Sequence, residues 1–271
     1  MVLAFIAGFL GLGLGYVYVG KIRLGAAAIV GFCLTVGFFA WTRLIVQSAI
    51  MLWLLAVLLI LIALFALIHP IVLAAKNRDV PATRCNRWWF YLLWSLGTVA
   101  LGPTIFFTRA TLLGYETFRV ASTSMSPTLE QGELFVSDSW RYHRHAVAVG
   151  EIVVFESPEN PGIKYIKRVV AIAGDSVGIR DGVLYRNGRQ VDEPYIHAPM
   201  LYGGSSRNVP EFTLGSGLIY VLGDYRDNSM DSRQWGPLLT SSLRGRVQYI
   251  WLSMDRENRI RWGRISMRLN P

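Results

Sequence analysis

Residues 165–175 read Tyr-Ile-Lys-Arg-Val-Val-Ala-Ile-Ala-Gly-Asp, and this stretch predicts the fold of the polar half of the chain. β-Branched and aromatic residues favour strands, in which successive side chains point to opposite faces. Alternation therefore places Tyr165, Lys167 and Val169 on one face and the intervening residues on the other. A lysine on a strand is usually solvated, so Lys167 among apolar neighbours is a candidate functional residue only in combination with other motifs.

Similar strand-like runs recur on both sides of this stretch. They are Leu134–Ser137, Ile152–Phe155, Val177–Arg180, Leu218–Leu222, Val247–Trp251 and Arg259–Trp262. Asp181-Gly182 and Asn187-Gly188 are strong hairpin signals. No long helical periodicity follows Thr111. We predict a mostly antiparallel, all-β domain over residues 111–271, with a small cap or excursion around 191–214, where the sequence is polar and rich in Pro and Gly.

The N-terminal part has a different composition. Of the 271 residues, 52% are hydrophobic and only 17% are charged, against about 25% charged in an average soluble protein. Four apolar runs account for this excess, namely Val2–Val19, Gly25–Trp41, Ala49–Ile68 and Trp88–Phe107. A bilayer-spanning helix needs about 20 such residues. We predict a transmembrane region of about four helices over residues 1–110, with Pro70 kinking or ending the third helix.

The distribution of basic residues predicts the topology and argues against nucleic-acid binding. The formal net charge is +9, and residues 1–107 carry seven Lys or Arg against one acid. Six of the seven flank the first and third connections between apolar runs, and only Arg43 lies in the second. Because cytoplasmic loops are enriched in Lys and Arg, everything after Phe107 is expected outside the cytoplasm. Met1 is followed by no basic segment, so a cleaved leader is not expected.

Three segments of the polar half carry candidate chemistry. They are Ser122–Leu129 (STSMSPTL), Tyr165–Asp175 and Gly223–Gly236 (GDYRDNSMDSRQWG). In this order and spacing they resemble the type I signal peptidases, or leader peptidases, and the resemblance covers about residues 115–263. It implies a membrane-anchored serine endopeptidase that removes signal peptides from exported preproteins with a Ser/Lys dyad.

The resemblance assigns Ser124 as the nucleophile and Lys167 as the general base. A free lysine amine has a pKa of about 10.4, so the base must be buried to be neutral near pH 7. Tyr165, Val169 and Met125 are expected to supply that burial, and Met125 and Val169 to line the substrate pocket.

The remaining roles also follow from the resemblance. Ser229 is expected to hold the lysine amine, and the oxyanion hole to be the Ser124 N–H with the Ser122 hydroxyl. Asp231 and Arg233 are expected to form a supporting salt bridge, and Arg168 to be structural. The chain departs from the family pattern at Ala121, Thr123, Ala173 and Tyr225, which puts its cleavage preference in question.

Other chemistries are less well supported by the sequence. The histidines His143, His145 and His197 lie in no catalytic motif, and Cys33 and Cys85 form no metal or redox motif. No cofactor or metal is expected. The expected partners are preprotein signal peptides, membrane lipid and secretion machinery, with no nucleic acid, at the inner membrane. Two alternatives stay open, a specialised Ser/Lys peptidase for a dedicated substrate such as a pilin, and a non-catalytic membrane scaffold.

Overall fold

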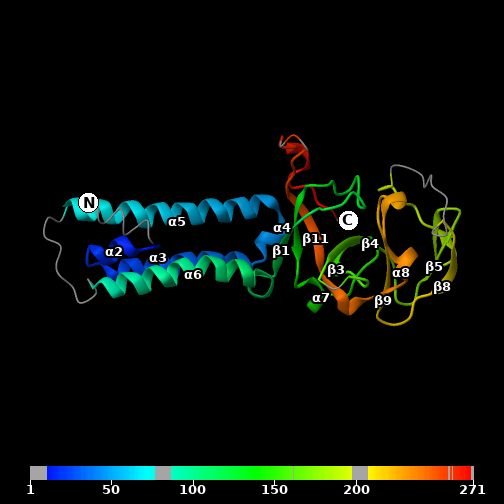
Figure 1. Cartoon of the computed structure of the whole chain (residues 1–271), viewed down its shortest axis with the longest axis horizontal. Coiled ribbons are helices and arrows are strands. Elements are labelled where there is room, and N and C mark those ends of the chain that lie inside the picture. Colours follow the sequence, from blue (N-terminus) through cyan, green and yellow to red (C-terminus); the bar gives the residue numbers. More distant parts are fainter. Residues whose placement is uncertain are drawn as a thin grey trace. The chain divides into compact units, whose positions relative to one another are not determined.

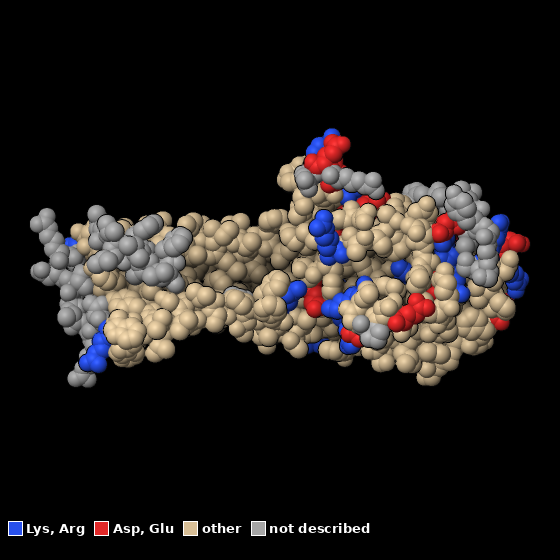
Figure 2. All heavy atoms as spheres, in the orientation of Figure 1, with Lys and Arg blue, Asp and Glu red and all other residues tan. Residues whose placement is uncertain are grey.

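A computed structural model of the chain describes residues 11–76, 87–160, 162–196, 207–255, 257 and 259–269 (Figure 1). The chain divides into two compact units, Met1–Gly114 and Tyr115–Pro271. The first unit is helical and the second is built mainly of strands. In Figure 2 the charged side chains visible on this face gather over the second unit, which agrees with the composition of the two halves.

The helices described in the first unit are α2 (Leu14–Tyr18), α3 (Ile22–Trp41), α4 (Leu44–Gln47), α5 (Ala49–Lys76) and α6 (Trp88–Leu112). By length and composition, α3 and α5 are candidate membrane spans within the described residues. Helix α6 adds a third candidate if its two parts, which meet at an angle of 41° before Pro103, form one span. Proline removes a helical hydrogen bond and so explains a bend at this place.

Two expectations about these helices need correction. Pro70 neither ends nor interrupts α5, which continues through it to Lys76. The described end of the first apolar run is not a membrane-long helix, because Gly13 adopts a left-handed conformation (φ 79°) and only the five residues of α2 follow it. Residues 2–10 of that run, and residues 77–86 of the basic connection, lie outside the described part of the chain.

Helix α2 is packed inside the helical unit. Tyr16 is 1% exposed, and its hydroxyl lies 2.8 Å from Nδ1 of His69 on α5. A Cβ on Gly13 would come within 2.7 Å of the carbonyl oxygen of Gly25, so the two backbones are in close contact. Small residues thus allow close packing at this position, as the glycine-rich sequence predicts.

Within its described residues the second unit holds two antiparallel sheets. In spatial order, the larger sheet contains β1 (Tyr115–Arg119), β2 (Leu134–Asp138), β11 (Leu243–Leu252), β3 (Ile152–Glu156), β4 (Lys164–Ile172), β9 (Leu218–Leu222) and β10 (Leu238–Leu239). The smaller contains β7 (Arg189–Gln190), β6 (Val183–Arg186), β5 (Ser176–Arg180) and β8 (Val209–Thr213). The short helices are α7 (Arg141–Arg144), α8 (Ser232–Trp235), η2 (Arg226–Asn228), η3 (Thr240–Ser242) and η4 (Trp262–Arg264).

The predicted turns account for the smaller sheet. Asp181 and Asn187 adopt positive φ angles of 51° and 54°, and each is followed by a glycine with positive φ. Two consecutive residues of this kind form the tight hairpin turns that join β5 to β6 and β6 to β7. Residues 209–213 of the expected excursion form β8, residues 197–206 lie outside the described chain, and Arg259–Trp262 is not a strand.

The core of the second unit follows the strand alternation. On β3, Ile152 and Val154 belong to one buried cluster and Val153 and Phe155 to another. Since successive side chains point to opposite faces, the larger sheet is covered on both sides. A third cluster joins residues of β4 and β9 to the smaller sheet. The central strand β4 is therefore buried along most of its length, and this buried strand carries Lys167.

Candidate active site

Ser124 and Lys167 meet in the second unit, although 43 residues separate them along the chain. Ser124 lies in the loop between β1 and β2, and Lys167 lies on β4. The lysine Nζ donates a hydrogen bond to Ser124 Oγ at 2.9 Å and another to the carbonyl oxygen of Ile166 at 3.1 Å. Ser124 is 8% exposed and Lys167 is 4% exposed. The predicted nucleophile and base are thus in contact and almost shielded from water.

The surroundings of Lys167 favour its neutral form. Burial lowers the pKa of Lys167 from 10.5 to about 8, because the charged ammonium loses hydration. The negative charges of Asp231 and Asp224 act against this change, and the positive charge of Arg233 adds to it. The amine also lies 5.6 Å from the centre of the Tyr165 ring. A pKa of about 8 leaves a usable fraction of free amine at neutral pH.

The nucleophile loop is fixed by contacts with the Gly223–Gly236 segment. The carbonyl oxygen of Ser124 accepts a hydrogen bond from the backbone N–H of Tyr225 at 3.0 Å. A Cβ on Gly223 would come within 2.6 Å of the same oxygen. The hydroxyl of Ser122 lies 3.1 Å from Ser124 Oγ. Ser122 is therefore close enough to contact an atom that reacts with Ser124.

Ser229 is adjacent but does not make the predicted hydrogen bond to the lysine amine. It is 8% exposed, and its hydroxyl has no hydrogen-bond partner in the described structure. Gly223 packs against it, since a Cβ there would lie 2.1 Å from Ser229 Oγ. The role expected for Ser229 thus needs correction in this conformation, where the amine donates to Ser124 and to the backbone.

Two buried ion pairs support the site. Arg233 Nε donates to Asp231 at 2.8 Å, with both side chains at most 1% exposed. Asp231 also accepts from the backbone N–H groups of Gly223 and Arg233, so it caps α8 as well. The second pair is Arg168 with Asp224, which form two hydrogen bonds of 2.9 and 2.7 Å. Arg168 points away from the nucleophile, in line with its expected structural role.

A pocket of about 300 Å³ opens beside the dyad. Its lining residues are Arg119–Ser122, Ser124, Met125, Ile163–Lys167, Asn228 and Met230. Met125 lines the pocket as predicted, but Val169 does not, because it is fully buried in a core cluster with residues of β3 and β9. Ile166, predicted only as a residue of the opposite face, is at the pocket instead. The lining is mostly apolar apart from the dyad, which suits small uncharged side chains.

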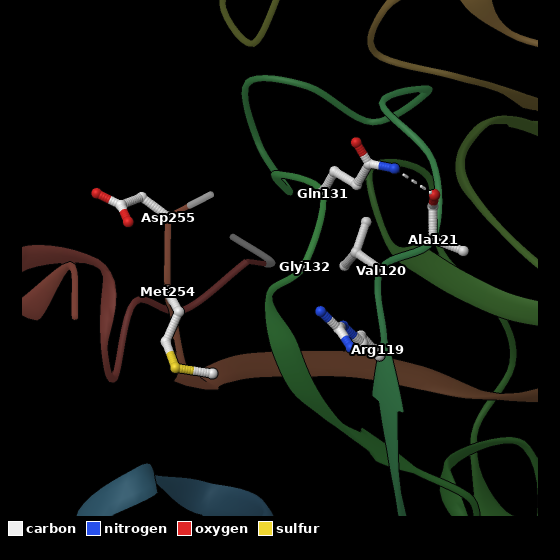
Figure 3. Close-up of a pocket in the computed structure, with 7 residues that line it drawn as sticks. All are labelled: Arg119, Val120, Ala121, Gln131, Gly132, Met254 and Asp255. Carbon is white, nitrogen blue, oxygen red and sulfur yellow. Dashed lines mark hydrogen bonds between the residues drawn. The ribbon is translucent and has the colours of Figure 1, made fainter. Parts of the chain in front are cut away.

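A second hollow, of about 460 Å³, shares Arg119, Val120 and Ala121 with this pocket (Figure 3). Its remaining lining comes from Gln131, Gly132, Met254 and Asp255. The amide of Gln131 donates to the carbonyl oxygen of Ala121 at 2.9 Å, which fixes this end of β1 between the two hollows. Sequence patterns did not predict this second hollow.

The described histidines of the second unit do not line the pocket beside Ser124. His143 lies on α7 and His145 directly follows it, and both are exposed. Neither lines the pocket that holds Ser124. His197 lies outside the described residues. Among the described residues, a lysine and no histidine is in contact with the Ser124 hydroxyl.

Comparison with known proteins assigns the chain to a family. The family described as signal peptidase, peptidase S26, matches residues 89–252, which is more than half of the chain. The chain belongs to this family. It is similar to the probable signal peptidase I-1 of Synechocystis sp., with 36% identity over 153 residues that cover 54% of this chain and 73% of the relative. It is also 31% identical to signal peptidase I of Bacillus caldolyticus over 176 residues, covering 61% of this chain and 90% of that protein.

A signal peptidase I from Enterococcus faecalis V583 is a related solved structure. It is 29% identical, its TM-score is 0.33, and the match covers 38% of this chain and 97% of that one. Family membership makes this chain a serine endopeptidase of the signal peptidase I type.

Thr123, one of the residues that depart from the family pattern, forms a side-chain hydrogen bond in the structure. Thr123, which stands between Ser122 and the nucleophile, accepts a hydrogen bond on its hydroxyl from the Asn228 side-chain amide at 2.7 Å. Asn228 lines the pocket beside Ser124. The threonine thus adds a side-chain hydrogen bond between the nucleophile loop and the Gly223–Gly236 segment, which are also joined by the backbone hydrogen bond from Tyr225 to Ser124. Sequence inspection marked Thr123 as unusual but could not indicate this partner.

Proposed function

We propose that this signal peptidase removes signal peptides from exported preproteins, with Ser124 as nucleophile and Lys167 as general base. The observation that carries the proposal is the 2.9 Å contact between a buried lysine amine and a buried serine hydroxyl at the edge of a pocket. An amine with a pKa near 8 can take the serine proton at neutral pH.

The reaction uses these groups in two steps. The neutral Lys167 amine takes the Ser124 proton while Oγ bonds to the scissile carbonyl carbon. The resulting oxyanion accepts hydrogen bonds from the Ser124 N–H and the Ser122 hydroxyl. The Lys167 ammonium then protonates the departing amine, and the C–N bond breaks to leave an acyl-enzyme. A water that gives its proton to Lys167 attacks this ester, and Ser124 regains its hydrogen as the signal peptide leaves.

The pocket beside Ser124 supports the substrate class. Signal peptides end in small residues of an A-x-A type. Met125, Tyr165 and Ile166 supply short apolar walls for such side chains. An extended substrate has alternate side chains on the same side, so residues one and three before the cut can both reach the pocket.

We also propose how the chain is placed in the cell. Residues 1–110 act as a multi-pass anchor in the cytoplasmic membrane, and residues 111–271 form the catalytic domain outside it. The candidate spans and the concentration of basic residues near residues 76–87 support this orientation. Ser124 follows the end of α6 at Leu112 by only 12 residues, which keeps the nucleophile within a short chain length of the membrane.

Cleavage of a model preprotein tests the proposal. Wild type, Ser124→Ala and Lys167→Ala are compared as full-length chains in detergent, with Ser241→Ala, at an exposed position of η3, as the serine control. The wild type and the control are expected to cut after a small-x-small site, and both dyad variants to be inactive. Normal cutting by Lys167→Ala would overturn the dyad. Cutting of a pilin-type substrate but no signal peptide would favour a dedicated peptidase.

A further inference from the structure

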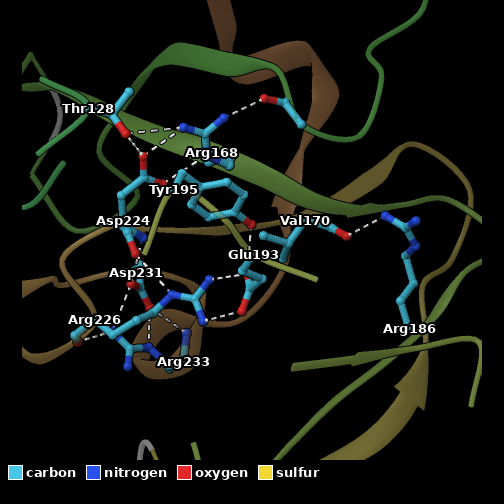
Figure 4. A network of polar contacts seen from close by, with 12 residues as sticks. Thr128, Arg168, Val170, Arg186, Glu193, Tyr195, Asp224, Arg226, Asp231 and Arg233 are labelled. Carbon is cyan, nitrogen blue, oxygen red and sulfur yellow. Dashed lines mark hydrogen bonds and ion pairs between the residues drawn. The ribbon is translucent and has the colours of Figure 1, made fainter. Parts of the chain in front are cut away.

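A turn in the connection between β7 and β8 of the smaller sheet contacts two arginines next to the active site. In this turn, residues 193–196, the backbone N–H of Ile196 donates to the carbonyl oxygen of Glu193 at 3.0 Å. Pro194 occupies the second position, where its fixed φ favours such a turn. Figure 4 shows Glu193 and Tyr195 pointing toward the arginines. The Tyr195 hydroxyl donates to Glu193 at 2.7 Å, so the two side chains act as one unit.

Glu193 binds the guanidinium of Arg226. Two guanidinium N–H groups donate to the two oxygens of Glu193, and the Arg226 side chain is only 4% exposed. The third donor, Nε, reaches the carbonyl oxygen of Gly223 at 3.1 Å. Arg226 therefore connects the carboxylate of the turn to the backbone of Gly223.

Gly223 is in direct contact with the catalytic serine. A Cβ on it would meet the carbonyl oxygen of Ser124 at 2.6 Å and Ser229 Oγ at 2.1 Å. Because these contacts leave no free space, a shift of Gly223 has to move the backbone of Ser124 as well. The path from Glu193 to the nucleophile thus consists of one ion pair, one hydrogen bond and one van der Waals contact.

Tyr195 contacts the other arginine. Its ring lies 4.0 Å from the guanidinium carbon of Arg168, the residue that follows Lys167 on β4. Arg168 is held by Asp224, the residue that follows Gly223. A cation over an aromatic face is attracted to it, and this attraction is stronger when water is excluded. The turn therefore contacts the strand of the base and the segment packed on the nucleophile at the same time.

We infer that Glu193 and Tyr195 are positioning residues of this peptidase, which hold Ser124 in reach of Lys167 by acting through Arg226 and Arg168. The inference rests on the proposed function of the dyad. Neither residue lines the pocket beside Ser124, so their loss should affect the chemical step rather than the binding of substrate. Removing the Glu193 charge also leaves the buried guanidinium of Arg226 without its carboxylate partner. A buried unpaired charge is unfavourable, so Arg226 is expected to shift toward solvent and to displace the residues it contacts.

The smaller sheet offers a matched control group. Arg180 forms an ion pair with Glu211 at 3.0 Å and lies 4.9 Å from the centre of the Tyr185 ring. This group has the same three residue types, but it is largely exposed and does not contact the dyad segments. Variants of this control group therefore measure how much an arginine–glutamate–tyrosine group contributes to the stability of the smaller sheet, without a contact to the dyad.

Steady-state cleavage of a preprotein by the full-length chain in detergent tests the inference. The rate is normalised to folded, monodisperse enzyme. Glu193→Gln and Tyr195→Leu are expected to lower kcat about tenfold or more, with KM within about twofold of wild type, since small misplacements of reacting groups have effects of this size. Tyr195→Phe keeps the ring over Arg168 and should retain most of the activity that Tyr195→Leu loses. Glu211→Gln and Tyr185→Phe should match wild type.

The outcomes separate the two proposals. If the wild type cuts and the Glu193 and Tyr195 variants keep its kcat, with only a lower melting temperature, the inference is wrong and the turn is merely structural. A rise in KM alone would also overturn it. If Glu193→Gln does not fold, the comparison of Tyr195→Phe with Tyr195→Leu decides. A wild-type chain that cuts no preprotein would instead overturn the proposed function.

Discussion

The carbonyl oxygen of Ser124 lies against the backbone of Gly223, at a distance that no side chain at position 223 could tolerate. A Cβ there would come within 2.6 Å of that oxygen. The glycine is required by this close approach, since its φ lies outside the left-handed range. The nucleophile loop and the Gly223–Gly236 segment thus fit together because position 223 has only a hydrogen.

Gly223→Ala is therefore expected to lower preprotein cleavage at least about a hundredfold, because the added methyl displaces Ser124 from Lys167. Overpacking of this kind also destabilises, by about 1–3 kcal/mol. Cleavage rate and thermal unfolding measure the two effects. Gly263→Ala is the control, since a Cβ there meets nothing within 4 Å. Full activity of Gly223→Ala would mean that the two segments can separate without cost to catalysis.

The pH dependence of cleavage should report the Lys167 amine. Only the neutral amine accepts the serine proton, and burial lowers the pKa of this group to about 8. Activity is therefore expected to be low at pH 6 and to rise with a midpoint near 8 in kcat/KM, which reports the free enzyme. A profile that is flat between pH 6 and 9 would contradict the assignment of Lys167 as base.

The lowered pKa of Lys167 also makes the free energy of unfolding depend on pH. A pKa that is lowered from 10.5 to about 8 on folding means that the unfolded chain binds the proton more tightly. Burying this lysine then costs about 3 kcal/mol below pH 8, at about 1.4 kcal/mol for each pH unit, and the cost disappears as pH rises toward 10.5.

Lys167→Met removes that cost together with two hydrogen bonds, to Ser124 and to Ile166. The variant is expected to be inactive but more stable than wild type at pH 7, with an advantage that shrinks between pH 8 and 10. Denaturant unfolding at several pH values measures this. If Lys167→Met were less stable than wild type at pH 7, and by the same amount at pH 10, burial of the Lys167 amine would carry no free-energy cost.

Local sequence patterns predicted several strands of the second unit and brought Ser124 and Lys167 forward as the candidate dyad. Short apolar runs rich in β-branched and aromatic residues predict β3, β4 and β9, and the Asp-Gly and Asn-Gly pairs predict the turns of the smaller sheet, because both signals depend on neighbouring residues in the sequence. Ser124 and Lys167 could be chosen because they lie in short motifs with a known spacing. Their contact was expected only from the family resemblance, because no local sequence pattern shows that the β1–β2 loop lies next to β4.

Features that depend on distant packing could not be predicted in this way. Alternation placed Val169 on the same face as Lys167, but it could not show that the core covers that face at Val169. The orphaned hydroxyl of Ser229 and the contacts of Glu193 with Arg226 involve segments far apart in sequence. Pro70 was expected to kink or end its helix, yet α5 continues past it, because packing between apolar helices can compensate for one lost backbone hydrogen bond.

Substitution of Thr123 tests whether its hydrogen bond affects which residue the enzyme accepts before the cut. The Thr123 hydroxyl accepts a hydrogen bond at 2.7 Å from Asn228, which lines the pocket beside Ser124. Thr123→Val keeps the shape of the side chain but removes the acceptor. The nucleophile loop and the Gly223–Gly236 segment then lose one of the hydrogen bonds that join them and keep the backbone hydrogen bond from Tyr225 to Ser124. The variant is expected to lower kcat/KM about threefold to tenfold for a preprotein with Ala before the cut, as for one neutral hydrogen bond. The loss should be smaller for a preprotein with Val there, because a looser pocket accepts a larger residue.

Thr123→Ser retains the hydroxyl and serves as the control for this comparison. It is expected to keep both the rate and the preference of the wild type. Equal losses for the Ala and Val substrates in Thr123→Val would show that this hydrogen bond affects catalysis in general and does not set the size of the pocket.

The buried carboxylate of Glu133 is expected to make the stability of the nucleophile loop depend on pH. The Glu133 side chain is fully buried and accepts from Arg264, from Ser253 at 2.7 Å and from the backbone of Glu130 at 2.9 Å. Burial alone would raise the pKa of Glu133, but the hydrogen bonds, chiefly from Arg264, outweigh it and lower the pKa. Arg264 also donates to the carbonyl oxygens of Pro127 and Thr128, so this carboxylate anchors the loop just after the nucleophile.

A carboxyl whose pKa is lowered on folding stabilises the protein above its ordinary pKa of 4.5, and this contribution is lost as pH falls through the folded value. Glu133→Gln is therefore expected to cost about 3–5 kcal/mol at pH 7, as for other broken buried ion pairs. The difference from wild type should shrink below pH 4.5, where the wild-type carboxyl is protonated too. Denaturant unfolding between pH 3 and 7 measures both values.

The control for this prediction is Glu257→Gln. Glu257 pairs with Arg259 at 3.0 Å, but both side chains are 71% exposed. Exposed pairs contribute little, so this variant should unfold like wild type at every pH. Because Glu133 reaches the nucleophile loop through Arg264, Glu133→Gln should also lower cleavage at pH 7 in the fraction that remains folded. Unchanged cleavage by that fraction, together with a pH-independent loss of stability, would show that the Glu133 charge neither anchors the loop nor governs its acid sensitivity.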